Sequence, residues 1–221
     1  MKLVIFGATG RTGVPLVERA LEHGHEVVAF ARDGAGLPTS IRTHERVAVV
    51  EGDAYAGEGI ETAIGGAGSG DDPVDAAVSV LGQTSSGPDD LLTVAGEHVF
   101  AAMDEHGVDR FVTLVGAGVR EDGESVSLGG RAMGALLSLL ASEVLEDAER
   151  HVEAVRASDV RWTVVRAPRL IDGDPADAVR HGTDLRLGLR DAVSRANVAA
   201  FILYCLEDDL YVREIPKLTG R

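Results

Sequence analysis

The sequence is poor in cysteine and in long apolar runs. Its one cysteine, Cys205, excludes a disulfide within the chain and is typical of a reducing compartment. No apolar run approaches the length needed to cross a bilayer, and the first residues lack the charged-then-apolar pattern of a signal peptide. We therefore expect a soluble, cytoplasmic protein without a membrane partner.

Basic residues are also scarce. The chain has 36 acidic and 21 basic residues, which gives a formal net charge of −15 at pH 7. Such a surface repels phosphate backbones, so nucleic acid is not an expected partner. Only Lys2 and Lys217 are lysine. The acidic, lysine-poor composition fits a salt-loving organism and fits a GC-rich genome equally well.

A glycine-rich turn directly follows an apolar run near the start of the chain. Residues 2–6 predict a strand buried on both faces, and apolar residues at helical spacing follow from Val14. Between them lie three glycines at a G-x-x-G-x-x-G spacing: Gly7, Gly10 and Gly13. This order brings backbone N–H groups and the positive end of a helix towards a pyrophosphate. It predicts dinucleotide binding, with Thr12 capping the helix and Pro15 in its first turn.

The end of the next expected strand, residues 26–31, bears on which dinucleotide is bound. An acidic residue there holds the ribose hydroxyls of NAD, whereas an arginine accommodates the 2′-phosphate of NADP. Arg32 occupies this position, so NADP is favoured over NAD, and Arg11 would add a second positive contact. In the alternative interpretation, Asp33 contacts the ribose and Arg32 is only solvated.

Strands and helices are expected to alternate along the rest of the chain. Further strands are predicted at 46–51, 74–81, 110–115, 161–166 and 212–218, and helices at 55–64, 88–106, 141–158 and after Ser194. This alternation requires right-handed crossovers and a parallel sheet. We expect one α/β domain over residues 1–221, a Rossmann-like doubly wound sheet with helices on both faces. Its substrate region would be the C-terminal part, about 116–185.

Several other positions carry open alternatives. Asp53, after the third strand, is expected to accept a hydrogen bond from adenine, to cap the next helix, or to do both. Ser85 and Ser86 follow the fourth strand and are candidate substrate contacts. The apolar stretch 129–140 is a flap, a dimer contact or core, which leaves monomer and homodimer open. His23-Gly24-His25 has no third ligand nearby in the sequence, so a polar helix end is favoured and no metal is expected.

These motifs, in this order, resemble the atypical short-chain dehydrogenase/reductases. The likeness covers essentially the whole chain and is greatest for proteins similar to biliverdin reductase B (flavin reductase) and for the NmrA-like NAD(P)H-binding proteins. It rests on Phe-Gly-Ala-Thr-Gly-Arg-Thr-Gly (6–13), Ala-Arg-Asp (31–33), Gly-Asp (52–53), Leu-Gly (81–82), Leu-Val-Gly-Ala-Gly (114–118) and Val-Arg-Ala-Pro-Arg (165–169).

The resemblance implies a set of cofactor contacts. The phosphates would be held by Gly7, Thr9, Gly10, Arg11 and Thr12, with Gly13 closing the turn. Arg32 would hold the 2′-phosphate, and Asp53 and Ala54 would lie by the adenine. The middle of the cofactor and its nicotinamide would be lined by Leu81, Gly82, Val115, Gly116, Pro168, Arg169 and Leu170.

The chain departs from the family in its catalytic groups. The usual acid is a tyrosine followed four residues later by a lysine that lowers its pKa. Here the tyrosines, Tyr55, Tyr204 and Tyr211, are followed at that spacing by Gly59, Asp208 and Ile215. The family's serine and histidine on the substrate side are replaced by Gly116 and Arg169. This pattern argues against ordinary alcohol–ketone chemistry and against nucleotide-sugar epimerisation.

Two functions of different classes therefore remain. One is an NADPH-dependent reductase of a flavin, a quinone or a similar conjugated small molecule, with Arg169 steadying negative charge on the acceptor. The other is a non-catalytic NADP(H) sensor that reports the redox state to a partner protein. The missing tyrosine–lysine pair favours the sensor. The compact length and the lack of a partner module favour the reductase.

Overall fold

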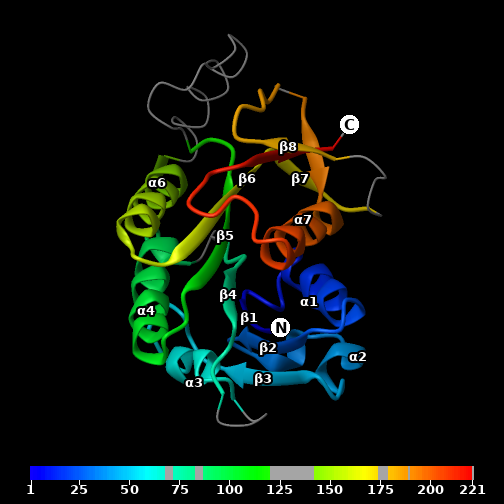
Figure 1. The fold of residues 1–221 in the computed structure, drawn as a ribbon, viewed down its shortest axis with the longest axis vertical. Coiled ribbons are helices and arrows are strands. Elements are labelled where there is room, and N and C mark those ends of the chain that lie inside the picture. The colour runs from blue at the N-terminus through cyan, green and yellow to red at the C-terminus, as the bar shows by residue number, and fades with distance from the viewer. Residues whose placement is uncertain (68–71, 83–86, 120–141, 174–178, 189, 221) are drawn as a thin grey trace.

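The protein is described by a computed structural model at residues 1–67, 72–82, 87–119, 142–173, 179–188 and 190–220. Its central feature is an eight-stranded sheet of order β3-β2-β1-β4-β5-β6-β10-β8 (Figure 1). The strands are β1 Lys2–Phe6, β2 Glu26–Ala31, β3 Val47–Glu51, β4 Ala76–Ser79, β5 Arg110–Gly116, β6 Arg161–Ala167, β8 Arg180–Gly182 and β10 Lys217–Thr219. All of them pair in parallel except β8, which is antiparallel to β10.

Helices cover both faces of this sheet (Figure 1). One face carries α1 Gly13–Glu22, α2 Thr39–Arg42 and α7 Arg195–Glu207, and the other carries α3 Ile60–Ile64, α4 Leu91–His106 and α6 Ser142–Ala157. A second, two-stranded parallel sheet pairs β7 Arg169–Ile171 with β9 Ala192–Ser194. The predicted Rossmann-like α/β architecture is confirmed.

The alternation of strand side chains divides the core into two layers. In β1, Leu3 and Ile5 face one way and pack with α1 and α7, whereas Val4 and Phe6 face the other way and pack with α3, α4 and α6. All four are fully buried. Cys205 also lies in the core, as expected, and burial raises its pKa to about 12, so the thiol stays protonated.

Some element boundaries differ from those predicted. The helix expected at 55–64 forms only over Ile60–Ile64, because Gly57 and Gly59 have left-handed φ values of 77° and 79° that interrupt it. The last strand, expected at 212–218, forms over Lys217–Thr219, and Arg213 within the expected range has a positive φ of 60°, which a strand does not allow. The stretch 129–140 lies outside the described residues.

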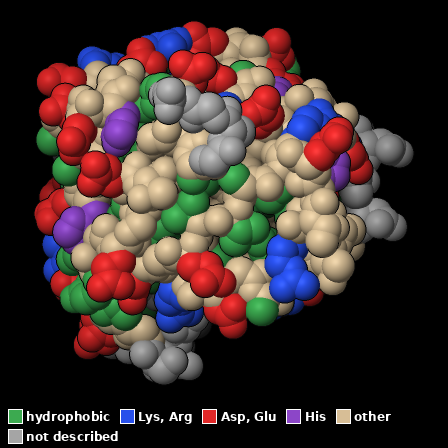
Figure 2. Space-filling view, turned by 90° about the horizontal axis from the view of Figure 1, so that it is seen from below, with side chains coloured by type: hydrophobic (Ala, Val, Ile, Leu, Met, Phe, Trp, Pro, Cys, Tyr) green, Lys and Arg blue, Asp and Glu red, His purple; other side chains and the backbone are tan. Residues whose placement is uncertain are grey.

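The surface reflects the acidic composition. Acidic side chains surround the face seen from below, and apolar side chains show at its centre (Figure 2). Among the described residues, no helix is both long enough and apolar enough to cross a membrane.

Candidate functional site

The strand order identifies the edge of the sheet at which a ligand is expected to bind, namely the edge formed by the carboxyl ends of the strands. From β1 the chain winds outward to β2 and β3, and then returns to place β4, β5 and β6 on the other side of β1. The switch therefore lies between β1 and β4, and in such sheets ligands bind there, beyond the carboxyl ends of the strands. The glycine turn that follows β1 lies at this position.

The glycine turn is closed by its own backbone. Gly10 N donates to Gly7 O at 2.9 Å, and Val14 N donates to Gly10 O at 3.0 Å. Gly7 has a φ of 85°, which glycine adopts without strain. A side chain on Gly13 would place its Cβ only 2.0 Å from Gly7 O. Glycine is thus required for α1 to begin this close to β1.

Thr12 occupies the N-cap position of α1 but does not cap it with its side chain. Its backbone is helical, with φ −94° and ψ −33°, and its side chain makes no cap hydrogen bond. The predicted capping role is therefore wrong, because an N-cap side chain reaches the next turn from an extended backbone. Pro15 lies in the first turn of α1, as predicted.

Near the end of β2, two carboxylates accept hydrogen bonds from the backbone, whereas an arginine side chain remains free. Asp33 Oδ1 accepts a hydrogen bond from Ala35 N at 2.8 Å, and Glu51 Oε1 accepts one from Gly34 N at 2.9 Å. Arg32 is exposed, and within the described residues its guanidinium has no hydrogen-bond or ion-pair partner. The positive charge at this strand end is therefore available to a ligand.

Asp53 follows β3 and is half-buried. Its Oδ1 accepts a hydrogen bond from Tyr55 N at 2.9 Å, which makes a local turn. It does not cap α3, whose N-cap residue is Gly59. Of the two roles predicted for Asp53, helix capping is wrong, and the adenine contact stays a prediction. Ala54 beside it is 5% exposed.

The remaining predicted cofactor residues lie at the ends of neighbouring strands. Leu81 and Gly82 follow β4, and an added Cβ at Gly82 or at Gly116 would meet no described atom within 4 Å. Because β4, β5 and β6 are adjacent and parallel, the residues at their carboxyl ends lie on the same edge of the sheet. These residues are Leu81, Gly82, Val115, Gly116, Pro168, Arg169 and Leu170. Ser85 and Ser86 lie outside the described residues.

An ion-pair cluster that the sequence did not predict joins the glycine turn to the C-terminal half. Arg11 pairs with Asp172 Oδ2, and Arg195 Nη1 lies 2.7 Å from Asp172 Oδ1. The hydrogen bond from Arg11 and the charges of both arginines hold the pKa of Asp172 below its ordinary value. The positive charge of Arg11 is thus partly compensated by Asp172, which comes 161 residues later.

No tyrosine of the chain is followed four residues later by a lysine that could serve this edge of the sheet. Lys2 lies at the amino end of β1, the opposite edge, where its Nζ donates to Asp72 O at 2.9 Å. Tyr55 and Tyr204 are exposed, and the Tyr211 hydroxyl lies 2.8 Å from His181 Nδ1. The site can position a dinucleotide, but it lacks the tyrosine–lysine spacing of the usual acid.

The fold and the glycine turn define a Rossmann-type dinucleotide-binding protein. Consistent with this, the profile of a family described as NAD(P)H-binding matches residues 7–209, so the chain belongs to that family. The structure is similar to a short-chain dehydrogenase/reductase from Veillonella parvula in complex with NADP, with a TM-score of 0.80 at 17% identity over 99% of this chain and 94% of the other.

Two further solved structures share the fold. An anaerobilin reductase from Escherichia coli O157:H7 has a TM-score of 0.76 at 20% identity, covering 99% of this chain and 96% of its own. A putative NAD-dependent epimerase/dehydratase from Bacillus halodurans has a TM-score of 0.77 at 17% identity, covering 100% and 94%. The fold is thus used by proteins of different activities, and activity has to be argued from the site.

Proposed function

We propose that the protein is an NADPH-dependent reductase of a flavin, a quinone or a similar conjugated small molecule. The observation that carries the cofactor choice is the free guanidinium of Arg32 at the end of β2. A 2′-phosphate would gain a charge-assisted hydrogen bond there. Asp33, the alternative ribose contact, already accepts a hydrogen bond from its own turn.

The lack of an activated tyrosine favours an acceptor that needs little proton assistance. NADPH would supply a hydride, and water would supply the proton that completes the two-electron reduction of the acceptor. The chain then contributes mainly position and charge. Arg169 is exposed at the start of β7, directly after Pro168, and would steady negative charge on the acceptor. Residues 116–185, in a single domain, would form the substrate region, with Ser85 and Ser86 as further contacts.

Calorimetric titration with NADPH and with NADH tests the cofactor. We expect NADPH to bind more tightly, and Arg32→Ala to weaken NADPH binding by roughly 1–3 kcal/mol while leaving NADH binding unchanged. Arg150→Ala, which removes an exposed arginine from α6, is the matched control and should change neither. Equal or tighter binding of NADH would move the ribose contact to Asp33.

A second function, a non-catalytic NADP(H) sensor, is favoured by the missing tyrosine–lysine pair. Oxidation of NADPH measured with a panel of flavins and quinones separates the two functions. Turnover that falls in Arg169→Ala by a larger factor than NADPH affinity does is expected for the reductase. Tight NADPH binding without turnover across the panel would favour the sensor.

A further inference from the structure

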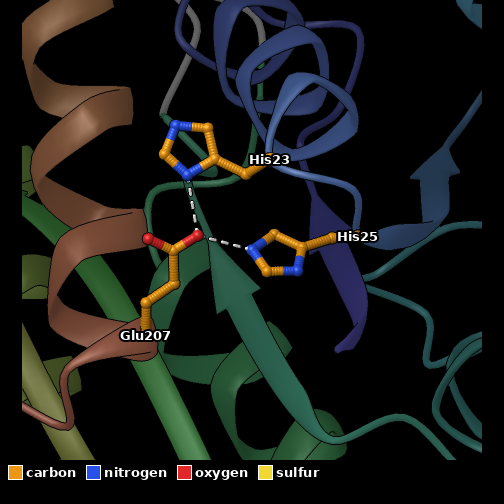
Figure 3. Close-up of side chains that lie close together, drawn as sticks. All are labelled: His23, His25 and Glu207. Atoms are coloured by element: carbon orange, nitrogen blue, oxygen red, sulfur yellow. Dashed lines mark hydrogen bonds and ion pairs between the residues drawn. The ribbon is translucent and has the colours of Figure 1, made fainter.

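Two histidines and a glutamate meet at the edge of the sheet opposite the dinucleotide site (Figure 3). His23 Nδ1 and His25 Nε2 lie 2.8 Å and 2.7 Å from the same oxygen, Glu207 Oε1. The three ligand atoms all lie within 4.8 Å of one another. His23 and His25 both follow the end of α1, and Glu207 is the last residue of α7.

The geometry points to a divalent metal site, and we propose that His23, His25 and Glu207 bind Zn²⁺. Imidazole nitrogens and a carboxylate oxygen are ordinary zinc ligands, and three protein ligands leave a fourth position for water. Glu207 is 29% exposed and His23 is 35% exposed at their side chains, so water has access to that position. His25 is only 10% exposed and anchors the site from the protein side.

The way α1 ends explains why both imidazoles reach the same point. Gly24 N donates to Leu21 O and His25 N donates to Ala20 O, each at 3.0 Å, which is the Schellman pattern of a helix C-terminus. Gly24 has the left-handed φ of 87° that this motif requires. The motif reverses the chain after His23, so that His25 begins the approach to β2 with its ring towards Glu207.

The distances require only a small adjustment to admit an ion. Ligand atoms at about 2.0 Å from a tetrahedral zinc lie about 3.3 Å apart. The two nitrogens therefore need to move about half an ångström from Glu207 Oε1, within reach of side-chain rotation. His25 presents Nε2 to Glu207 Oε1, and its other ring nitrogen, Nδ1, lies 3.3 Å from the Met1 amino group.

The electrostatics of this region favour a cation. The C-terminal ends of α1 and α7 both lie here, and each carries the partial negative charge of its helix dipole. The bound ion would tie the end of α1 to the end of α7.

Zinc titration of the metal-stripped full chain, followed by competition with a chromophoric chelator, tests this site. We expect one Zn²⁺ per chain, with affinity at least about tenfold lower in His23→Gln and in Glu207→Gln. His98→Gln, which removes an exposed histidine from α4, should leave the affinity unchanged. Co²⁺ in place of Zn²⁺ should show visible d–d bands that are lost in the two site variants.

Circular dichroism of each variant establishes that it is folded before affinities are compared. Stoichiometric binding lost in His23→Gln and retained in His98→Gln would support the site. Zinc binding that is absent in the wild type, or unchanged in both site variants, would overturn it and leave a hydrogen-bonded cluster at a helix end. Because no cofactor is involved, this result is independent of the proposed reductase activity.

Discussion

Gly13 is the residue at which the site depends most on the absence of a side chain. A Cβ added at this position would lie 2.0 Å from Gly7 O and 2.8 Å from Ala8 Cα, and both atoms belong to the backbone of the turn. Backbone cannot rotate away as a flexible side chain would. Any side chain at Gly13 must therefore push α1 away from the end of β1 and widen the turn that faces the ligand.

We expect Gly13→Ala to lower the free energy of unfolding by about 1–3 kcal/mol, the usual cost of overpacking. It should also weaken dinucleotide binding, because the N–H groups of the turn move. Urea denaturation and calorimetric titration measure the two effects. Gly188→Ala is the control: its nearest contact would be 3.8 Å away, at Asp191. Wild-type stability in Gly13→Ala would contradict the close approach of α1 to β1.

Single residues were predictable where the constraint is local in the sequence. The glycine turn is one such case, because a strand, three glycines and a helix follow one another within a few residues. Asp172 and Glu207 could not be found in the same way. Each meets its partners, Arg11 and the pair His23 and His25, only through folding, across separations of 161 to 184 residues.

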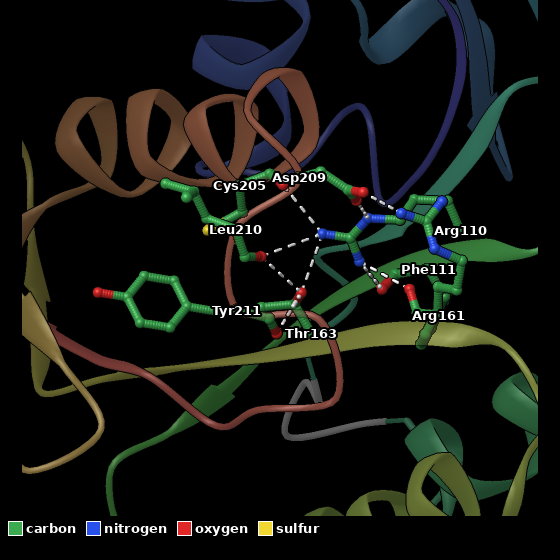
Figure 4. Close-up of polar contacts among 8 residues, drawn as sticks. All are labelled: Arg110, Phe111, Arg161, Thr163, Cys205, Asp209, Leu210 and Tyr211. Atoms are coloured by element: carbon green, nitrogen blue, oxygen red, sulfur yellow. Dashed lines mark hydrogen bonds and ion pairs between the residues drawn. The ribbon is translucent and has the colours of Figure 1, made fainter.

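At the scale of the elements, Arg110 joins β5, β6 and α7. It is 3% exposed, and its guanidinium donates to Arg161 O at 2.7 Å and to Cys205 O at 3.0 Å (Figure 4). It also donates to Thr163 Oγ1 at 3.0 Å and to Leu210 O at 3.4 Å.

The segment bonded to Arg110 includes left-handed residues that are not glycine, among them Asp209 and Tyr211. Such a conformation is costly for residues with a side chain and persists only where the surroundings hold it. Burial lowers the pKa of Arg110, while the Asp209 carboxylate opposes that shift. The buried guanidinium thus stabilises, by hydrogen bonds, the segment that connects α7 to β10.

Replacing Arg110 with methionine should lower the free energy of unfolding by about 3 kcal/mol, because buried carbonyl groups lose their charged donor. Arg161→Met is a matched control, since Arg161 pairs with the same Asp209 but is 42% exposed, and exposed pairs contribute about 0–1 kcal/mol. Thermal and urea denaturation compare the two variants. Equal losses of unfolding free energy in the two variants would show that the buried Arg110 stabilises the fold no more than the exposed Arg161 does.

Strand positions were predicted better than helix lengths, again for a physical reason. Apolar runs mark buried strands directly, and β1 and β2 have the predicted bounds. The start of α4, in contrast, is set by tertiary structure: Asp147 of α6 accepts hydrogen bonds from Leu92 N at 2.8 Å and Thr93 N at 3.0 Å. A cap supplied by another helix leaves no local signal in the sequence.

For the molecule as a whole, the layer of α4 and α6 against β5 contains a buried titratable side chain. His151 is 1% exposed, and its Nε2 lies 3.1 Å from Thr113 Oγ1. Gly96 of α4 makes room for the ring, since a Cβ there would lie 2.8 Å from His151 Nδ1. Burial lowers the pKa of His151 from 6.5 to about 4, and the Asp147 carboxylate and a backbone hydrogen bond at Leu92 oppose the shift.

This depressed pKa makes the stability of the fold depend on pH. Between pH 6.5 and about 4, the unfolded chain binds a proton at His151 that the folded chain does not. The contribution is therefore fully present above pH 6.5 and is lost as the pH falls towards 4. Between about pH 7.5 and about pH 5, the loss should be about 2 kcal/mol.

His151→Gln separates this loss from that of the carboxylates. Glutamine can retain a hydrogen bond to Thr113, but it does not titrate, so the variant should lose about 2 kcal/mol less than the wild type between the two pH values. Asp172 and Glu207, whose pKa values are held low, lose stabilisation on acidification in both proteins and cancel in the comparison. Urea denaturation at both pH values measures the difference. If wild type and variant lose the same stability, His151 must take up its proton as readily in the folded chain as in the unfolded chain, and the layer between α4 and α6 must admit water.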